Sequence, residues 1–185
     1  MRLFIAIPLP LFSLSSKLPL HFQQQLKKDH ISWTKPENFH LTLLFLGETN
    51  EKLIPEIMER LEEITYNFDP FNLTIEKTGL FGSAYDPKVI WAGAEPSGML
   101  QDLHFQIANT MEAVGYKADR QNFVPHLTIG RIKRLNDKKQ LQNALDARKA
   151  GHFFSQRVEE IALFESQLTN EGPKYNIKGV STLGC

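Results

Sequence analysis

One short pattern occurs twice in this chain and constrains the fold more than any other feature. The two copies are His40-Leu41-Thr42-Leu43 and His126-Leu127-Thr128-Ile129. Each is largely apolar, follows an aromatic residue and a proline, and precedes a glycine, which is typical of a β-strand bounded by turns. Side chains in a strand alternate between its faces, so the histidine and threonine of each copy share one face.

If the two strands lie side by side and line a solvent-filled groove, these side chains form a candidate active site. Two imidazoles can act as an acid and a base near neutral pH. Two hydroxyls can donate hydrogen bonds to an anionic oxygen. Two alternatives remain: structural histidines held by hydrogen bonds, or a zinc site. A zinc site would need further ligands, and no His-x-x-x-His spacing or cysteine pair supplies them.

The bulk composition fits an ordinary globular protein that occupies one domain over residues 1–185. Hydrophobic residues make up 42% and charged residues 23% of the chain. No segment has the roughly 18 consecutive apolar residues that span a membrane, so no membrane association is expected. The basic and then apolar start, ended by Pro8, indicates a first core strand rather than a signal peptide. A single cysteine, Cys185, cannot form an internal disulfide, which favours a cytoplasmic location.

The charge balance limits the kind of partner. There are 21 basic and 21 acidic residues, so the net charge is zero. A protein that coats nucleic acid by charge alone would carry a basic excess. An enzyme that holds one or two phosphates locally is compatible with this balance, and we expect it to be a monomer.

Strands and helices alternate along the chain in a pattern that predicts an α+β fold with antiparallel sheets. Helical spacing of apolar residues predicts helices over 11–29, 51–65, 97–114 and 137–149. Strands are expected over 2–7, 31–33, 40–47, 71–75, 89–92, 124–133, 153–158, 161–164 and 175–180. We expect Thr78 to Gly82 to form a glycine-punctuated loop and Glu171-Gly172-Pro173 to form a turn.

With both copies of the pattern and their flanks in view, the chain resembles the 2H phosphoesterases. Within that group it is similar to the RNA 2′,3′-cyclic phosphodiesterases, also called 2′-5′ RNA ligases. The matching segments are Arg2–Ile7, Trp33–Gly47, Phe123–Arg131, Phe164–Ser166 and Gly172–Tyr175. The resemblance implies two pseudo-symmetric lobes, each an antiparallel sheet packed with helices, that face each other across a central groove carrying both His-x-Thr strands.

The resemblance also implies roles for individual residues. His40 would donate a proton to the departing ribose oxygen, and His126 would accept a proton from the attacking water. The product would be a 2′-phosphate, and no cofactor or metal would be required. Thr42 and Thr128 are expected to bind the non-bridging phosphate oxygens. Reversal of the reaction with a ribose hydroxyl would give 2′-5′ ligation.

Several interpretations stay open at this stage. Arg131 lies five residues after His126, so strict alternation turns it away unless Gly130 permits a β-bulge. It is either a phosphate clamp or a solvated charge. Most aromatic residues, Phe45 included, are expected in the core, although Trp33 or Phe81 is a candidate for stacking a base. The substrate is RNA with a cyclic phosphate end or a small cyclic phosphate such as ADP-ribose cyclic phosphate. A non-catalytic RNA-binding module is the remaining alternative.

Overall fold

The strands form two antiparallel sheets in the computed structural model, which describes residues 1–83, 85–95, 97–116, 123–169 and 172–184. The expected turn at Glu171 and the expected free thiol at Cys185 lie outside the described residues. The first sheet has the strand order β3 (His40–Glu48), β1 (Arg2–Pro8), β8 (Glu160–Thr169), β9 (Gly172–Thr182). The second sheet has the order β2 (His30–Trp33), β6 (His126–Arg134), β5 (Pro87–Ala94), β4 (Phe71–Gly82), β7 (Ala150–Val158).

The two sheets repeat one arrangement. In the first, β1 lies between the first His-x-Thr strand and β8, and in the second, β5 lies between the other His-x-Thr strand and β4. Thr42 is opposite Ala6 in the first sheet, and Thr128 is opposite Trp91 in the second. Strand β2 is an addition at the outer edge of β6. The lobes are not the two halves of the sequence, because β8 and β9 return to the sheet that contains β1.

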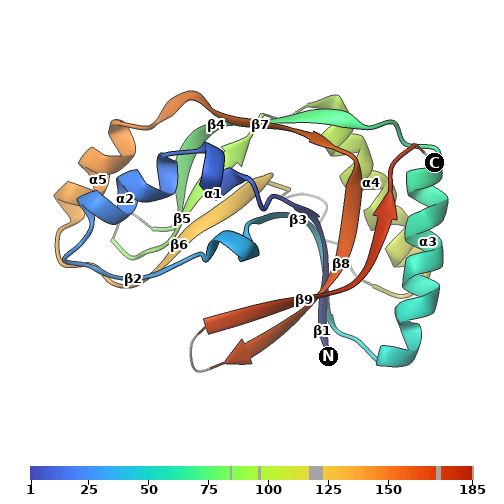
Figure 1. Ribbon diagram of the computed structural model, residues 1–185. Coiled ribbons are helices and arrows are strands. Elements are labelled where there is room, and N and C mark those ends of the chain that lie inside the picture. The colour runs from blue at the N-terminus through green and yellow to red at the C-terminus, as the bar shows by residue number, and fades with distance from the viewer. Residues whose placement is uncertain (84, 96, 117–122, 170–171, 185) are drawn as a thin grey trace.

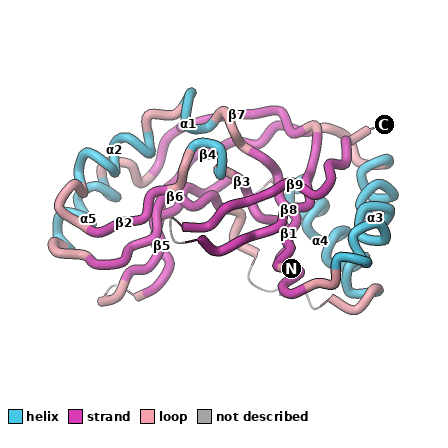
Figure 2. Tube along the Cα trace, turned by 60° about the horizontal axis from the view of Figure 1, so that its bottom comes forward, coloured by secondary structure: helices cyan, strands magenta, loops and turns pink. Residues whose placement is uncertain are grey.

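Helices cover the outer sides of the sheets and leave the strands between them (Figures 1 and 2). Helices α3 (Ile54–Tyr66) and α4 (Gly98–Ala113) lie at one end of the molecule, where α3 packs on β9 and α4 on β3. Helices α1 (Phe12–Ser15), α2 (Leu18–Gln25) and α5 (Lys138–Asp146) lie at the other end. Single 3-10 turns, Pro36–Asn38 and Glu51–Leu53, precede β3 and α3. No helix among the described residues is long and apolar enough to cross a membrane.

The core forms because each strand buries one face under these helices. Leu41 and Leu127, which separate histidine from threonine in the two patterns, are both 0% exposed. They belong to one apolar cluster that extends through both sheets and includes Ile57 and Leu103 of the helices. Burial of each such side chain contributes about 1.5–3 kcal/mol. The threonine and histidine faces are thereby directed away from the helices.

Two expectations about local structure were wrong. The helix expected over 11–29 is two short helices, because Pro19 lies in the first turn of α2 and the chain is extended at Ser16. The loop expected from Thr78 to Gly82 is the end of β4. This strand requires a glycine at position 79, because a Cβ atom there would lie 2.1 Å from the indole of Trp91.

Candidate active site

The two His-x-Thr strands line one groove between the sheets. Two hydrogen bonds join β6 to the segment that leads into β3. The Thr34 hydroxyl donates to the carbonyl of Thr128 at 2.7 Å, and the Thr34 amide donates to the carbonyl of Ile129 at 2.9 Å. The groove has a volume of about 1190 Å³, and its walls include all five residues expected at the site: His40, Thr42, His126, Thr128 and Arg131.

Both imidazoles are held in the same way by the backbone. Nδ1 of His40 donates to the carbonyl of Asn38, and Nδ1 of His126 donates to the carbonyl of Val124, each at 2.7 Å. A carbonyl oxygen can only accept, so the proton of each neutral ring is on Nδ1. The Nε2 atom of each ring is then the one available to accept or donate a proton at a ligand.

Aromatic side chains surround the histidine of the first sheet. The ring centroid of His40 lies 4.9 Å from that of Phe4 and 5.0 Å from that of Tyr175, which meets it edge-on. Phe164 lies 5.9 Å away on the same side. In the second sheet, Phe81 meets the ring of His126 edge-on at 4.6 Å. Each imidazole is therefore partly removed from water by apolar rings.

This burial controls the acidity of both histidines. The pKa of His40 is lowered from 6.5 to about 4: desolvation is the main cause, the charges of Arg131 and of a protonated His126 act in the same direction, and the hydrogen bond to the Asn38 carbonyl opposes them. Desolvation also lowers the pKa of His126, again assisted by Arg131 and opposed by the Val124 carbonyl. Both rings are accordingly neutral at pH 7 in the protein by itself.

A β-bulge in each strand sets which side chains follow the threonines into the groove. The β1–β3 register passes from Leu44 to Thr42 and skips Leu43, and the β5–β6 register passes from Gly130 to Thr128 and skips Ile129. The extra residue reverses the alternation of faces. The first six positions of β3 and β6 consequently share one burial pattern, and in both the sixth position is exposed. Strand β3 has a second bulge further on, where the register skips Leu46.

The bulge determines the face of β6 on which Arg131 lies. It is the sixth residue of β6 and faces the groove together with His126 and Thr128. Gly130 beside it leaves room for Trp33, because a Cβ atom there would lie 2.7 Å from that ring. Arg131 is close enough for its charge to lower the pKa of both histidines. Arg131 is thus an exposed charge on the groove wall, and its role as a phosphate clamp stays a prediction.

Comparison with known proteins agrees with the resemblance noted in the sequence. Residues 21–170 match the 2′-5′ RNA ligase superfamily. The chain belongs to this superfamily. The chain is 33% identical to an RNA 2′,3′-cyclic phosphodiesterase of Archaeoglobus fulgidus, covering 95% of this chain and 96% of that protein. Identity to the protein of the same name in Methanocaldococcus jannaschii is 32%, covering 96% and 98%.

Solved structures of similar fold extend this agreement to the whole architecture. The crystal structure of TT0787 of Thermus thermophilus superposes with a TM-score of 0.80 at 27% identity, covering 100% of this chain and 98% of that one. Escherichia coli LigT complexed with 3′-AMP has a TM-score of 0.77 at 22% identity, covering 98% and 97%. The expected α+β fold of two facing lobes is confirmed.

In this member of the 2′-5′ RNA ligase superfamily, one groove residue was misassigned from sequence. Phe45 was expected in the core, yet it is 67% exposed and lines the groove. It occupies the position in β3 that Arg131 occupies in β6, one after the doubly buried pair. Its ring lies 5.7 Å from that of Phe4 and presents a free face to solvent. The residues after the pattern gave no sign of this exposure, because the bulge is not visible in the sequence.

His104 is a packing residue rather than a residue of the helix surface, since it lies on α4 and is 7% exposed. Its Nδ1 donates at 2.9 Å to the carbonyl of Leu43, the bulged residue of β3. Its ring stacks on that of Phe123 at 3.8 Å, just before the Val124 carbonyl that holds His126. This superfamily member thus links both His-x-Thr strands through one buried ring.

The remaining described histidines do not supply a set of metal ligands at the site. Within the described part of the chain, no group of three or more His, Cys, Asp or Glu side chains is arranged to hold a metal ion. His21 contacts the Ala144 carbonyl, and His152 contacts the Ser155 hydroxyl. His30 is exposed at the end of β2 and lines the groove.

Proposed function

We propose that this protein hydrolyses RNA 2′,3′-cyclic phosphate ends to 2′-phosphates, without a metal, by acid–base catalysis from His40 and His126. The observation that carries the proposal is the matched pair of imidazoles on one groove, each with Nδ1 bound to a backbone carbonyl and Nε2 left for a ligand. The names of the Archaeoglobus and Methanocaldococcus relatives support the same reaction.

In the proposed reaction, water attacks phosphorus opposite the 3′ oxygen. Nε2 of His126 takes a proton from the water as the new P–O bond forms. The P–O3′ bond breaks, and Nε2 of His40 gives its proton to the departing O3′. The product keeps the phosphate on O2′, and proton exchange with solvent resets both rings. In-line displacement needs the acid and the base on opposite sides of phosphorus, which is why one histidine from each sheet suits it.

Four further groups would complete substrate binding. The hydroxyls of Thr42 and Thr128 share the faces of the two imidazoles and would donate to the non-bridging oxygens, where negative charge accumulates. The Arg131 guanidinium would bind the same phosphate, since planar guanidinium groups suit paired contacts to phosphate oxygens. The exposed ring of Phe45 would stack on the terminal base.

The acid role of His40 needs a proton that the ring does not hold at pH 7 in the protein by itself. Its pKa of about 4 reflects burial and the nearby positive charge of Arg131. A bound cyclic phosphate carries a negative charge that offsets Arg131 and favours the imidazolium. Substrate binding and proton uptake by His40 would therefore be coupled, and a bell-shaped pH–rate profile is expected.

The same groups would serve the reverse transfer, with a ribose hydroxyl in place of water, and this would be 2′-5′ ligation. A purely RNA-binding role is less well supported, because it does not need two partly buried imidazoles whose Nε2 atoms face a groove.

The test uses purified protein and an oligonucleotide ending in a 2′,3′-cyclic phosphate, in buffer containing EDTA. We expect hydrolysis to a 2′-phosphate, with His40→Ala and His126→Ala each lowering the rate about 10²-fold or more. His152→Ala, an exposed histidine on β7, controls for loss of a histidine as such.

Each part of the proposal has its own contrary result. A His126→Ala variant at the wild-type rate would remove the base. A 3′-phosphate product would reverse the leaving group, and loss of activity in EDTA would remove metal independence.

A further inference from the structure

We propose that Lys133 forms a second phosphate subsite, which binds the phosphodiester on the 5′ side of the terminal nucleotide. The inference rests on the proposed function, and it makes an oligonucleotide, rather than a mononucleotide, the preferred substrate.

Lys133 lies near the end of β6, two residues after Arg131, where the β2–β6 register skips it between Ile132 and Arg134. Arg131 and Lys133 are both exposed and both line the groove, while Ile132 between them packs against the core. Residues i and i+2 of a strand are about 6.5 Å apart along it. This separation is similar to that of successive phosphates in a nucleic-acid strand. A chain whose terminal phosphate lies at Arg131 can therefore place its next phosphate at Lys133.

The charge of the groove differs from that of the whole molecule. The chain has equal numbers of acidic and basic residues. The described groove lining contains Arg2, Arg131 and Lys133 but no Asp or Glu. A local excess of positive charge in a concave site attracts an anionic ligand, even when the net charge is zero.

Lys133 is also free to bind a ligand. Among the described residues, neither Lys133 nor Arg131 forms an ion pair or a side-chain hydrogen bond. Two other lysines do carry a carboxylate partner: Lys88 pairs with Asp86 at 2.6 Å and Lys178 with Glu165 at 3.7 Å. The absence of a counter-charge beside Lys133 leaves its ammonium group to a phosphate.

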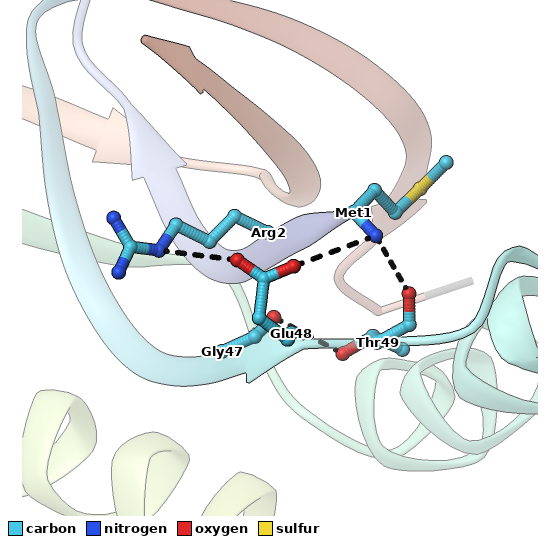
Figure 3. A network of polar contacts seen from close by, with 5 residues as sticks. All are labelled: Met1, Arg2, Gly47, Glu48 and Thr49. Atoms are coloured by element: carbon cyan, nitrogen blue, oxygen red, sulfur yellow. Dashed lines mark hydrogen bonds and ion pairs between the residues drawn. The ribbon is translucent and has the colours of Figure 1, made fainter.

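Arg2 is the weaker choice for this subsite. It lines the groove from the first sheet, but its Nε lies 3.7 Å from a carboxylate oxygen of Glu48. The same carboxylate is shared with the amino group of Met1 at 3.7 Å (Figure 3). Glu48 thus offsets part of the Arg2 charge, which is not the case for Lys133.

The size of the groove also supports a second phosphate subsite. Its volume of about 1190 Å³ exceeds the range of roughly 300–1,000 Å³ found for pockets that enclose drug-sized ligands. A single nucleoside cyclic phosphate would occupy only part of it. The groove therefore has room for a second nucleotide.

The experiment compares two substrates, adenosine 2′,3′-cyclic phosphate and the dinucleotide ApA ending in a 2′,3′-cyclic phosphate. We expect wild-type kcat/KM to be higher for the dinucleotide. Lys133→Ala should lower the dinucleotide value about tenfold, because a charge-assisted contact to one phosphate is lost. The mononucleotide value should be unchanged, and Lys133→Arg should retain the dinucleotide preference. Lys139→Ala, an exposed lysine on α5 outside the groove, is the matched control.

The salt dependence gives a second readout. The slope of log kcat/KM against log salt concentration should become shallower by about one in Lys133→Ala with the dinucleotide, as expected for one lost phosphate contact. Equal losses on both substrates, or no loss on either, would overturn the second subsite. A higher wild-type kcat/KM for the mononucleotide would overturn it as well. If wild type hydrolyses neither compound, the proposed function itself fails, which is a distinguishable result.

Discussion

The burial of His40 predicts that this one side chain destabilises the protein in acid. The pKa of His40 is about 4 in the folded protein, against 6.5 for an ordinary histidine. Between these values the unfolded chain binds a proton at His40 and the folded protein does not. The free energy of unfolding therefore falls by about 1.4 kcal/mol for each unit that the pH is lowered through this window. The loss starts near pH 6.5 and is complete below the folded pKa.

The perturbation that isolates this effect is His40→Gln, which removes the titrating group. Relative to this variant, wild type should lose about 2 kcal/mol more between pH 7 and pH 4.5. Urea unfolding of both proteins at the two pH values measures the difference. Other groups that titrate in this range contribute equally to both proteins, so they cancel. His152→Gln, the exposed histidine on β7, controls for removal of a histidine as such.

The result that would refute this reasoning is an identical pH dependence for wild type and His40→Gln. It would mean that the ring among Phe4, Phe164 and Tyr175 is hydrated in the folded protein. The proposed coupling between substrate charge and protonation of His40 would then lose its physical basis. NMR titration of the imidazole resonances would give the same pKa directly.

Two further variants test groups whose place only the structure reveals. Phe45→Leu keeps an apolar side chain but loses the flat ring face. We expect KM for a cyclic-phosphate oligonucleotide to rise about tenfold, which corresponds to the usual strength of one base–aromatic stack. An unchanged KM would argue against stacking. His104→Ala removes the donor to the Leu43 carbonyl and should lower kcat about tenfold or more, with a smaller change in KM. The amide of His104→Asn can donate at the same position, so this variant should recover part of that loss. Equal kcat values in the two variants would contradict the hydrogen-bond role.

Local patterns in the sequence were sufficient for most elements. Ser97 and Asp137 accept from backbone amides at the starts of α4 and α5, as their hydroxyl and carboxylate chemistry predicts. The helix over 51–65 was predicted from its apolar spacing, and Leu61 of α3 is buried. These features depend on residues within a few positions of one another, so the sequence alone contains the information.

Features that depend on a distant partner could not be obtained in this way. The extent of β4 beyond Ile75 depends on the indole of Trp91, which occupies the space above Gly79. The facing of Arg131 and Phe45 depends on bulges, and a bulge is defined only by the register with a neighbouring strand. The burial of His104 depends on Phe123 and on β3, which are distant in sequence.

The same bulge in both strands explains how a repeated pattern gives a groove with two different walls. After the bulge, β3 presents Phe45 and then Gly47, whereas β6 presents Arg131 and then Lys133. At these positions one wall offers an aromatic ring and the other two positive charges, which favours one orientation of a nucleotide in the groove. The two imidazoles would then meet opposite sides of the same phosphorus and could not exchange roles. We infer that the divergence at these two positions, rather than any difference between the His-x-Thr patterns themselves, assigns the acid to one lobe and the base to the other.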